Sequence, residues 1–273
     1  MIKEYAYAKI NLLLDVEKKR EDGFHDLKMI LIPIELHDEL TFEPSEEISL
    51  KSNIEIENNA VIHTANLMKK KYEVKDGARI TLQKTIPMGA GLGGGSADIA
   101  ATIRGLNTLW NLKLENTEME NLALSLGSDT LFCLYNKPAF VYGRGENILY
   151  VDVPSIESIY LFPSIINVST KNVFQKHRVK HNSKRFNRLF INYLNENYDR
   201  FFKKTYNHLL KTTVKCYPEL KKHYKAVRSI NQSAFMTGSG STFYILSFDK
   251  NDEPLREKIR KSGLESIKTK PKE

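Results

Sequence analysis

Hydrophobic and polar residues alternate along the first part of the chain in the manner of β-strands. Residues 10–16 place every second side chain on one apolar face, and residues 27–36 form a second apolar stretch after a turn at Asp22-Gly23. Lys9 and Asn11, two residues apart on the first strand, then point to the same face. In most proteins a lysine at such a position is simply exposed to solvent. Further short strands are predicted at residues 40–42, 48–50, 54–56 and 80–82.

Apolar residues spaced three or four apart predict helices on both sides of a glycine-rich stretch. Asn58 or Asn59 can cap the first of these helices. Its apolar face consists of Val61, Ala65, Met68 and Tyr72. Thr117 and Glu120 form a capping-box pattern for a later helix, which is predicted to end at Gly127.

The character of the chain changes near Val153-Pro154. Before this point, residues 139–142 and 148–151 are predicted to pair as a hairpin. After it, the chain is rich in helix-forming, basic and aromatic residues as far as about residue 230, and an apolar strand is expected at 243–248. We therefore expect an α+β protein with two domains, residues 1–153 and 154–273.

Composition adds bounds on the class of protein. The 273 residues are 41% hydrophobic and 27% charged, which is typical of a globular protein, and the net charge of +8 favours anionic partners. Cys133 and Cys216 stand too far apart for a C-x-x-C metal site, and two cysteines give no disulfide framework. The first residues lack an apolar segment, and the apolar run of residues 29–36 is too short to span a membrane. These features predict a cytoplasmic protein without a membrane partner.

The glycine-rich stretch is the strongest chemical signal in the sequence. Five glycines fall within residues 89–95, directly before a helix with Ile99, Ile103 and Leu106 on one face and with Ser96 placed as its N-cap. Bare backbone amides and the positive end of a helix dipole together favour phosphate binding, although a flexible glycine-rich surface loop is the alternative. A second glycine–serine turn, residues 237–241, is either a hairpin turn or another phosphate-facing turn.

Other glycine signatures fit this stretch poorly. A dinucleotide fingerprint needs a strand with an acidic residue about 20 positions later, and that strand is not evident after Trp110. A Walker A loop needs a lysine before Ser96, and the glycine loop of protein kinases lies between two strands. Asp129 lies between a helix and an apolar segment, where a carboxylate is either a cap or turn residue or a functional group.

Taken together, the motifs of this chain resemble those of the GHMP small-molecule kinases. The resemblance is carried by Ala8-Lys9-Ile10-Asn11-Leu12, Asp22-Gly23-Phe24-His25-Asp26-Leu27, IPMGAGLGGGSADIAA from Ile86, LGSD at 126–129, Gly143-Arg144-Gly145-Glu146 and TGSGS at 237–241. It implies an α+β GHMP kinase fold, with a ribosomal protein S5 domain 2-like N-terminal domain, a ferredoxin-like C-terminal domain and an active site in the cleft between them. The implied reaction transfers the γ-phosphoryl group of ATP to the 2-hydroxyl of a cytidine diphosphate-linked methylerythritol in non-mevalonate isoprenoid biosynthesis.

The resemblance also implies roles for individual residues. Asp129 would act on the acceptor hydroxyl and Lys9 would pair with it, while Asn11 would orient the polyol. Cytosine would stack between Phe24 and Phe174 and bind His25, with Gly238 and Ser239 also contacting the substrate. The residues expected to bind ATP are Asn59, Pro87, Met88, Gly89, Ala90, Gly91, Leu92, Gly93, Gly94, Gly95, Ser96 and Ala97. Mg²⁺ is expected with ATP, and no metal ligand is assigned.

Some positions depart from the family pattern. Phe24 replaces a common tyrosine, Leu131 and Ser241 replace prolines, and the segment Asn207-His208-Leu209-Leu210 lacks the two carboxylates of the motif. The basic segment of residues 175–200 matches no family motif and is explained by a solvated helical face, so no nucleic-acid partner is expected. A GHMP kinase for another small alcohol, and an inactive homologue that binds nucleotide or nucleic acid, remain the alternatives. The oligomeric state stays open.

Overall fold

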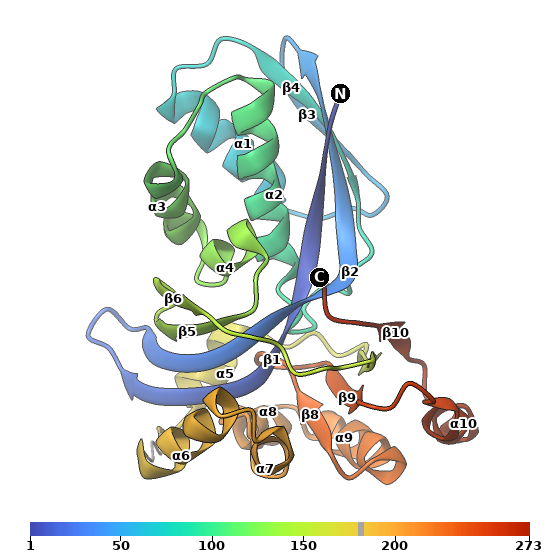
Figure 1. The fold of residues 1–273 in the computed structure, drawn as a ribbon. Coiled ribbons are helices and arrows are strands. Elements are labelled where there is room, and N and C mark those ends of the chain that lie inside the picture. The colour runs from blue at the N-terminus through green and yellow to red at the C-terminus, as the bar shows by residue number, and fades with distance from the viewer. Residues whose placement is uncertain (180–182) are drawn as a thin grey trace. The chain divides into compact units, whose positions relative to one another are not determined.

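The computed structural model describes residues 1–179 and 183–273, and within them the chain forms two compact units. Unit 1 contains residues 1–8, 36–88 and 93–137, and unit 2 contains residues 9–35, 89–92 and 138–273. Two long strands, β1 (Ile2–Lys19) and β2 (His25–Ser45), each contribute residues to both units (Figure 1). Because the units interleave along the chain, the division at residues 153 and 154 stays a prediction about the family domains.

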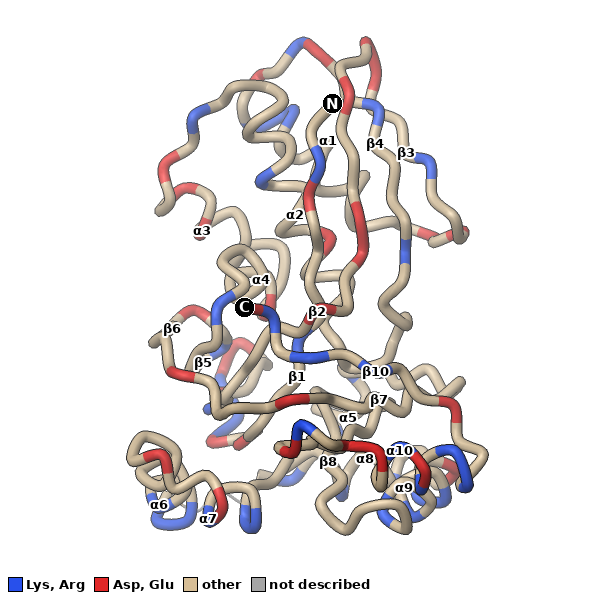
Figure 2. Tube along the Cα trace, turned by 45° about the vertical axis from the view of Figure 1, so that its right-hand side comes forward, with Lys and Arg blue, Asp and Glu red and all other residues tan. Residues whose placement is uncertain are grey.

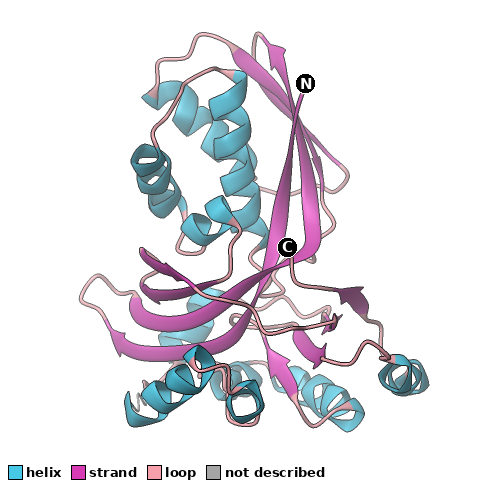
Figure 3. Cartoon of the chain, viewed as in Figure 1, coloured by secondary structure: helices cyan, strands magenta, loops and turns pink. Residues whose placement is uncertain are grey.

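Unit 1 is a layer of strands covered by helices. Strand β4 (Gly77–Gln83) pairs parallel with β3 (Ile48–Ser52) and antiparallel with β2, with Leu40 opposite Leu82. The helices are α1 (Ala60–Lys71), α2 (Gly94–Leu109), α3 (Asn116–Leu126) and α4 (Thr130–Tyr135). Helices α1 and α2 lie on one face of these strands (Figure 3), where alternate residues of β4 and the apolar face of α2 are buried.

The starts of the helices in unit 1 test the predicted caps. Asn59 caps α1 as predicted, since its side-chain oxygen accepts a hydrogen bond of 2.9 Å from the amide of Val61. The prediction that Ser96 caps α2 is wrong, because Gly93 takes a left-handed conformation (φ 75°) and lets the helix begin at Gly94. The capping box of the later helix is also wrong, because α3 already begins at Asn116.

Unit 2 contains the hairpin and a second sheet. Strands β5 (Ala139–Gly143) and β6 (Asn147–Tyr150) pair antiparallel and confirm the predicted hairpin, and β5 also pairs with residues 27–31 of β2. The second sheet has the strand order β10-β7-β9-β8. Its strands are β7 (Ser158–Phe162), β8 (Ala234–Met236), β9 (Phe243–Ser247) and β10 (Ile267–Thr269). The helices are α5 (Thr170–Lys176), α6 (Ser183–Leu194), α7 (Tyr198–Phe202), α8 (Leu210–Cys216), α9 (Pro218–Ile230) and α10 (Glu253–Ser262).

Two strand predictions need correction. Residues 54–56 form no strand, because the side chain of Asn53 turns to the backbone of Lys84, accepting from its amide at 2.7 Å and donating to its carbonyl at 3.0 Å. The strands predicted at 27–36 and 40–42 are one continuous strand, β2, whose hydrogen-bonded partner changes from β5 to β4 along its length.

Basic side chains of unit 2 gather on helices. Figure 2 shows Lys and Arg along α6 and α9. In α6, Phe186, Leu189 and Tyr193 are buried while the lysine and arginines are exposed, as expected for a solvated helical face. Residues 180–182 of the basic segment at 175–200 lie outside the described residues. Within the described ranges, the helices all lack the length and apolar content required to span a bilayer.

Candidate active site

Residues 89–92 of the glycine loop are held by main-chain contacts within unit 2. The Leu92 carbonyl accepts a 2.9 Å hydrogen bond from the Lys9 amide, and the Ala90 carbonyl accepts one of 3.1 Å from the Thr242 amide. A Cβ atom on Gly91, whose φ is 75°, would lie 2.4 Å from the carbonyl oxygen of Thr237. Glycine is therefore required at position 91, where two backbones meet without room for a side chain.

The remainder of the loop, from Gly93, forms the start of α2 in unit 1. No side chain hydrogen-bonds to the first turn as an N-cap, and a Cβ atom on Gly95 would meet nothing within 4 Å. The helix is 16 residues long. Because its first-turn amides lack partners within the helix and the positive end of its dipole lies here, an anion is favoured at this end. An uncapped helix start with open space beside a glycine fits a phosphate group.

The segment that contains Asp129 lies beside this helix start. A Cβ atom on Gly127, the residue that ends α3, would lie 3.6 Å from the hydroxyl oxygen of Ser96. Asp129 occupies the N-cap position of α4, yet its side chain makes no capping hydrogen bond. The structure of unit 1 thus brings the start of α2 and the segment that carries Asp129 to the same region.

Lys9 and Asn11 form a buried polar cluster in unit 2. Both are 3% exposed, and the Lys9 ammonium group donates a 2.9 Å hydrogen bond to the side-chain oxygen of Asn11. The same oxygen accepts from the amide of Gly238 at 2.8 Å and from the hydroxyl of Thr237 at 3.2 Å. Three predicted site residues, Lys9, Asn11 and Gly238, therefore lie together. Lys9 and Asp129 belong to different units, and their pairing stays a prediction.

The predicted pyrimidine-binding residues also lie in unit 2. The rings of His25 and Phe174 lie 5.2 Å apart, and Phe24, the residue before His25, is 47% exposed with the Arg144 guanidinium 4.6 Å above its ring. Burial lowers the pKa of His25, so its imidazole is neutral at physiological pH. A neutral imidazole beside an aromatic ring suits hydrogen bonding to an uncharged base.

Ser239 connects the second glycine–serine turn to α5, the helix that carries Phe174. Its hydroxyl lies 2.8 Å from that of Thr170, and its carbonyl accepts a 2.9 Å hydrogen bond from the Thr213 hydroxyl. The predicted ATP-binding residue Asn59 uses its side-chain oxygen to cap α1, and Met88 is 54% exposed. The roles of these residues toward ligands stay predictions.

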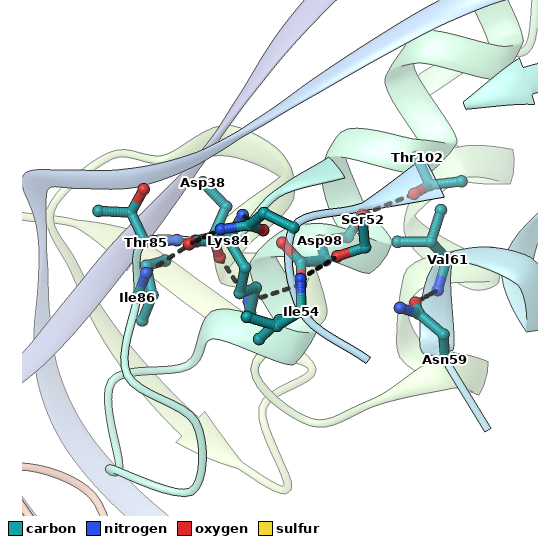
Figure 4. Close-up of polar contacts among 11 residues, drawn as sticks. Asp38, Ser52, Ile54, Asn59, Val61, Lys84, Thr85, Ile86, Asp98 and Thr102 are labelled. Carbon is teal, nitrogen blue, oxygen red and sulfur yellow. Dashed lines mark hydrogen bonds and ion pairs between the residues drawn. The ribbon is translucent and has the colours of Figure 1, made fainter. Parts of the chain in front are cut away.

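The structure contains a buried ionic cluster next to the glycine loop that the sequence analysis did not predict. In unit 1 the Lys84 ammonium lies 2.5 Å from a carboxylate oxygen of Asp38 and 2.7 Å from one of Asp98 (Figure 4). Burial raises the pKa of Asp98 to about 7. Two features of the sequence could have indicated this cluster. They are Lys84, three residues before Pro87, and Asp98, a carboxylate between Ala97 and Ile99 inside the predicted helix.

Metal ligation is not evident from side-chain clusters. Over residues 1–179 and 183–273, no group of three or more His, Cys, Asp or Glu side chains is arranged to hold a metal ion. This does not bear on an ion held mainly by a nucleotide's phosphates, as Mg²⁺ commonly is.

Known proteins resemble this chain in sequence over most of its length. Residues 59–144 match the family model of the GHMP kinases N terminal domain. The 4-diphosphocytidyl-2-C-methyl-D-erythritol kinase of Bacillus licheniformis is 36% identical over 251 residues, covering 89% of this chain and 87% of the relative. The enzyme of that name from Bacillus cytotoxicus is 45% identical over 175 residues, which span 62% of this chain and only 61% of the relative's length.

Solved structures agree with the sequence matches. A crystal structure of 4-(cytidine 5'-diphospho)-2C-methyl-D-erythritol kinase covers 100% of both chains with a TM-score of 0.79 and 26% identity. A mevalonate kinase structure matches with a TM-score of 0.74 at 13% identity, which shows the fold alone. The expected α+β GHMP kinase fold is thereby confirmed. On the combined evidence of the family model, the Bacillus licheniformis relative and the fold, this chain belongs to the GHMP kinase family.

Proposed function

We propose that this protein is an ATP-dependent kinase that phosphorylates the 2-hydroxyl of 4-diphosphocytidyl-2-C-methyl-D-erythritol, a step in non-mevalonate isoprenoid precursor biosynthesis. The observation that carries the proposal is the uncapped, glycine-rich start of α2 with the Asp129 segment beside Ser96. Two proteins that match this chain over most of their length are named as this kinase, and they support the choice of acceptor.

On the nucleotide side, the chain supplies amides and a helix dipole. The amides of residues 93–96 and the positive end of α2 would hold the phosphates of ATP, and Asn59 would contribute to the adenine site. Mg²⁺, when bound with ATP, would neutralise charge on the transferred phosphoryl group. Phosphoryl transfer depends mainly on such positioning and charge stabilisation, so a rigid cradle is the main requirement.

On the acceptor side, Asp129 would accept the hydrogen bond of the attacking hydroxyl and take its proton as the new bond to the γ-phosphorus forms. The bond from the γ-phosphorus to the β–γ bridging oxygen would break in the same transfer, and ADP would leave. The Lys9 ammonium would stabilise the negative charge that develops in the transfer. Asn11 would act by holding Lys9 and the Gly238 turn with one oxygen atom. The roles of Asp129 and Lys9 require both side chains to reach the same hydroxyl group.

The cytidine end of the acceptor would bind between aromatic rings. Phe24 and Phe174 would stack on the cytosine, and His25, buried and neutral, would hydrogen-bond its edge. This binding energy would hold the polyol in place for transfer.

A coupled assay of ADP release over a panel of alcohols tests the proposal. The panel contains 4-diphosphocytidyl-2-C-methyl-D-erythritol together with mevalonate and homoserine. The last two alcohols appear in the names of kinases that share this fold. We expect ADP release with the cytidylated alcohol and none above background with the other two. Faster turnover of mevalonate or homoserine, or no turnover of any acceptor, would contradict it.

A further inference from the structure

Three buried ionisable side chains meet where the glycine loop joins the body of unit 1. Lys84 follows β4, Asp38 lies in β2 and Asp98 lies in the second turn of α2, and their side chains are 5%, 0% and 6% exposed. Figure 4 shows the Lys84 ammonium group between the two carboxylates. It is a single cation that bridges a strand of the sheet and the helix that begins the predicted phosphate site.

The cluster also reaches the main chain on both sides of the loop. The second carboxylate oxygen of Asp38 accepts from the amides of Thr85 at 2.5 Å and Ile86 at 2.8 Å, just before the loop. A Cβ atom on Gly94, the first residue of α2, would lie 3.1 Å from the Lys84 nitrogen. The segment that leads into the loop and the helix that leaves it are therefore connected through one ammonium group.

Stability alone is a poor reason for this arrangement. Burying an ion carries a large desolvation cost, and well-packed apolar residues in place of a buried ion pair are often neutral or stabilising. This cluster buries two carboxylates against one ammonium, and one oxygen of Asp98 has no hydrogen-bond partner among the described residues. What the ions provide, and apolar groups would not, is directional contact with fixed geometry.

We propose that Lys84 is a positioning residue for phosphoryl transfer, which clamps the two ends of the glycine loop through Asp38 and Asp98 so that the loop amides are pre-organised for the phosphates of ATP. This rests on the proposed kinase function. Because such a clamp would pre-organise the loop before ATP binds, its loss should weaken nucleotide affinity. The KM for the acceptor should change little, since other residues are proposed to bind the acceptor.

Lys84→Met tests the clamp, with Arg104→Met as the matched control. Arg104 lies on α2, the helix that Lys84 contacts through Asp98, and it too makes an ion pair, at 2.7 Å to Glu4. Its other hydrogen bonds are to the carbonyls of Tyr5, Cys133 and Leu134. Calorimetric binding of the non-hydrolysable analogue AMP-PNP gives nucleotide affinity, and the acceptor KM is measured in parallel. We expect Lys84→Met to weaken AMP-PNP about tenfold or more with the acceptor KM within about twofold, and Arg104→Met to leave AMP-PNP affinity nearly unchanged. Equal affinities in Lys84→Met and the wild type, or equal losses in both variants, would overturn the proposal.

A pair of Asp98 variants covers the case in which Lys84→Met does not fold. Asp98→Ala cuts the link from Lys84 to α2 and keeps the Lys84–Asp38 ion pair, while Asp98→Asn can still accept a hydrogen bond from Lys84. AMP-PNP affinity should fall in Asp98→Ala and recover in Asp98→Asn. Wild-type affinity in Asp98→Ala would overturn the clamp alone. A wild-type protein that binds no AMP-PNP would overturn the kinase function as well.

Discussion

Asp129 occupies the N-cap position of the short helix α4, and its side chain makes no capping hydrogen bond. Aspartate is favoured at this position because its carboxylate usually accepts an amide hydrogen bond there. The Asp129 segment lies beside Ser96 at the start of α2, where the amides and the helix dipole favour phosphate. This is the local argument for its proposed action on the acceptor hydroxyl.

Replacing Asp129 by asparagine removes a proton acceptor and keeps the shape of the side chain. We expect kcat to fall by about 10² to 10⁴, the usual range for a general acid–base group, with AMP-PNP affinity unchanged. Steady-state kinetics and calorimetry measure the two quantities, and Asp76→Asn, at an exposed position, is the control. Near-normal turnover of Asp129→Asn would remove Asp129 from its assigned role.

Phe174 provides a test of the pyrimidine site that is independent of the chemistry. Loss of an aromatic ring that stacks on a base costs about 1–3 kcal/mol, so Phe174→Ala should raise the KM for the cytidylated acceptor by roughly 5-fold to 150-fold. The KM for ATP should stay within about twofold. Phe248→Ala, which removes a ring that is 49% exposed elsewhere in unit 2, serves as the control. A similar rise in both KM values would argue against a pyrimidine clamp.

At the scale of elements, the position of α2 on the sheet of unit 1 depends on one glycine. A Cβ atom on Gly105 would lie 2.3 Å from the ring of Phe42, a fully buried residue of β2. Because backbone and ring are in direct contact here, the helix packs closer to the sheet than any residue with a side chain would allow.

We therefore expect Gly105→Ala to lower the free energy of unfolding by about 1–3 kcal/mol through overpacking. Urea unfolding followed by the fluorescence of Trp110 measures it, since this single tryptophan caps the C-terminus of α2 in unit 1. Gly95→Ala is the matched control in the same helix, where a Cβ atom meets nothing within 4 Å, and should not lower stability. If both variants lost the same stability, the contact with Phe42 would not be the cause.

At the scale of the whole molecule, the stability of the folded chain should depend on the protonation of Asp98. Burial raises its pKa from 3.8 to about 7, against the opposing effect of Lys84 and with Asp38 facing it as a like charge. The folded chain thus holds a proton that the unfolded chain releases, so this contribution is complete below about pH 4 and is lost as pH rises through about 7.

Asp98→Asn should remove that pH dependence. We expect the stability difference between wild type and variant to shift in favour of the variant by up to about 1.4 kcal/mol per pH unit between about pH 4 and 7. Thermal unfolding across this range, followed by Trp110 fluorescence, measures it. A difference that stays constant with pH would mean that Asp98 does not titrate in this window.

Local features of the fold were predictable because they depend on neighbouring residues. Asn59 caps α1, residues 139–150 form a hairpin, and Gly89, Gly91 and Gly93 take the positive φ angles that glycine allows. The start of α2 was misplaced at Ser96 because the left-handed conformation of Gly93 brings the chain into the helix three residues earlier than the side-chain pattern indicated.

By itself, the sequence predicted that the loop binds phosphate, and it determined the family and the residue types available for catalysis, since these follow from local spacing and from motifs. Only the tertiary structure decided that Asn11 holds Gly238, 227 residues away, and that Lys84 joins Asp38 to Asp98. The physical reason is that hydrogen bonds between distant residues depend on strand register and on how helices pack against the sheet. No local pattern of hydrophobic and polar residues encodes either.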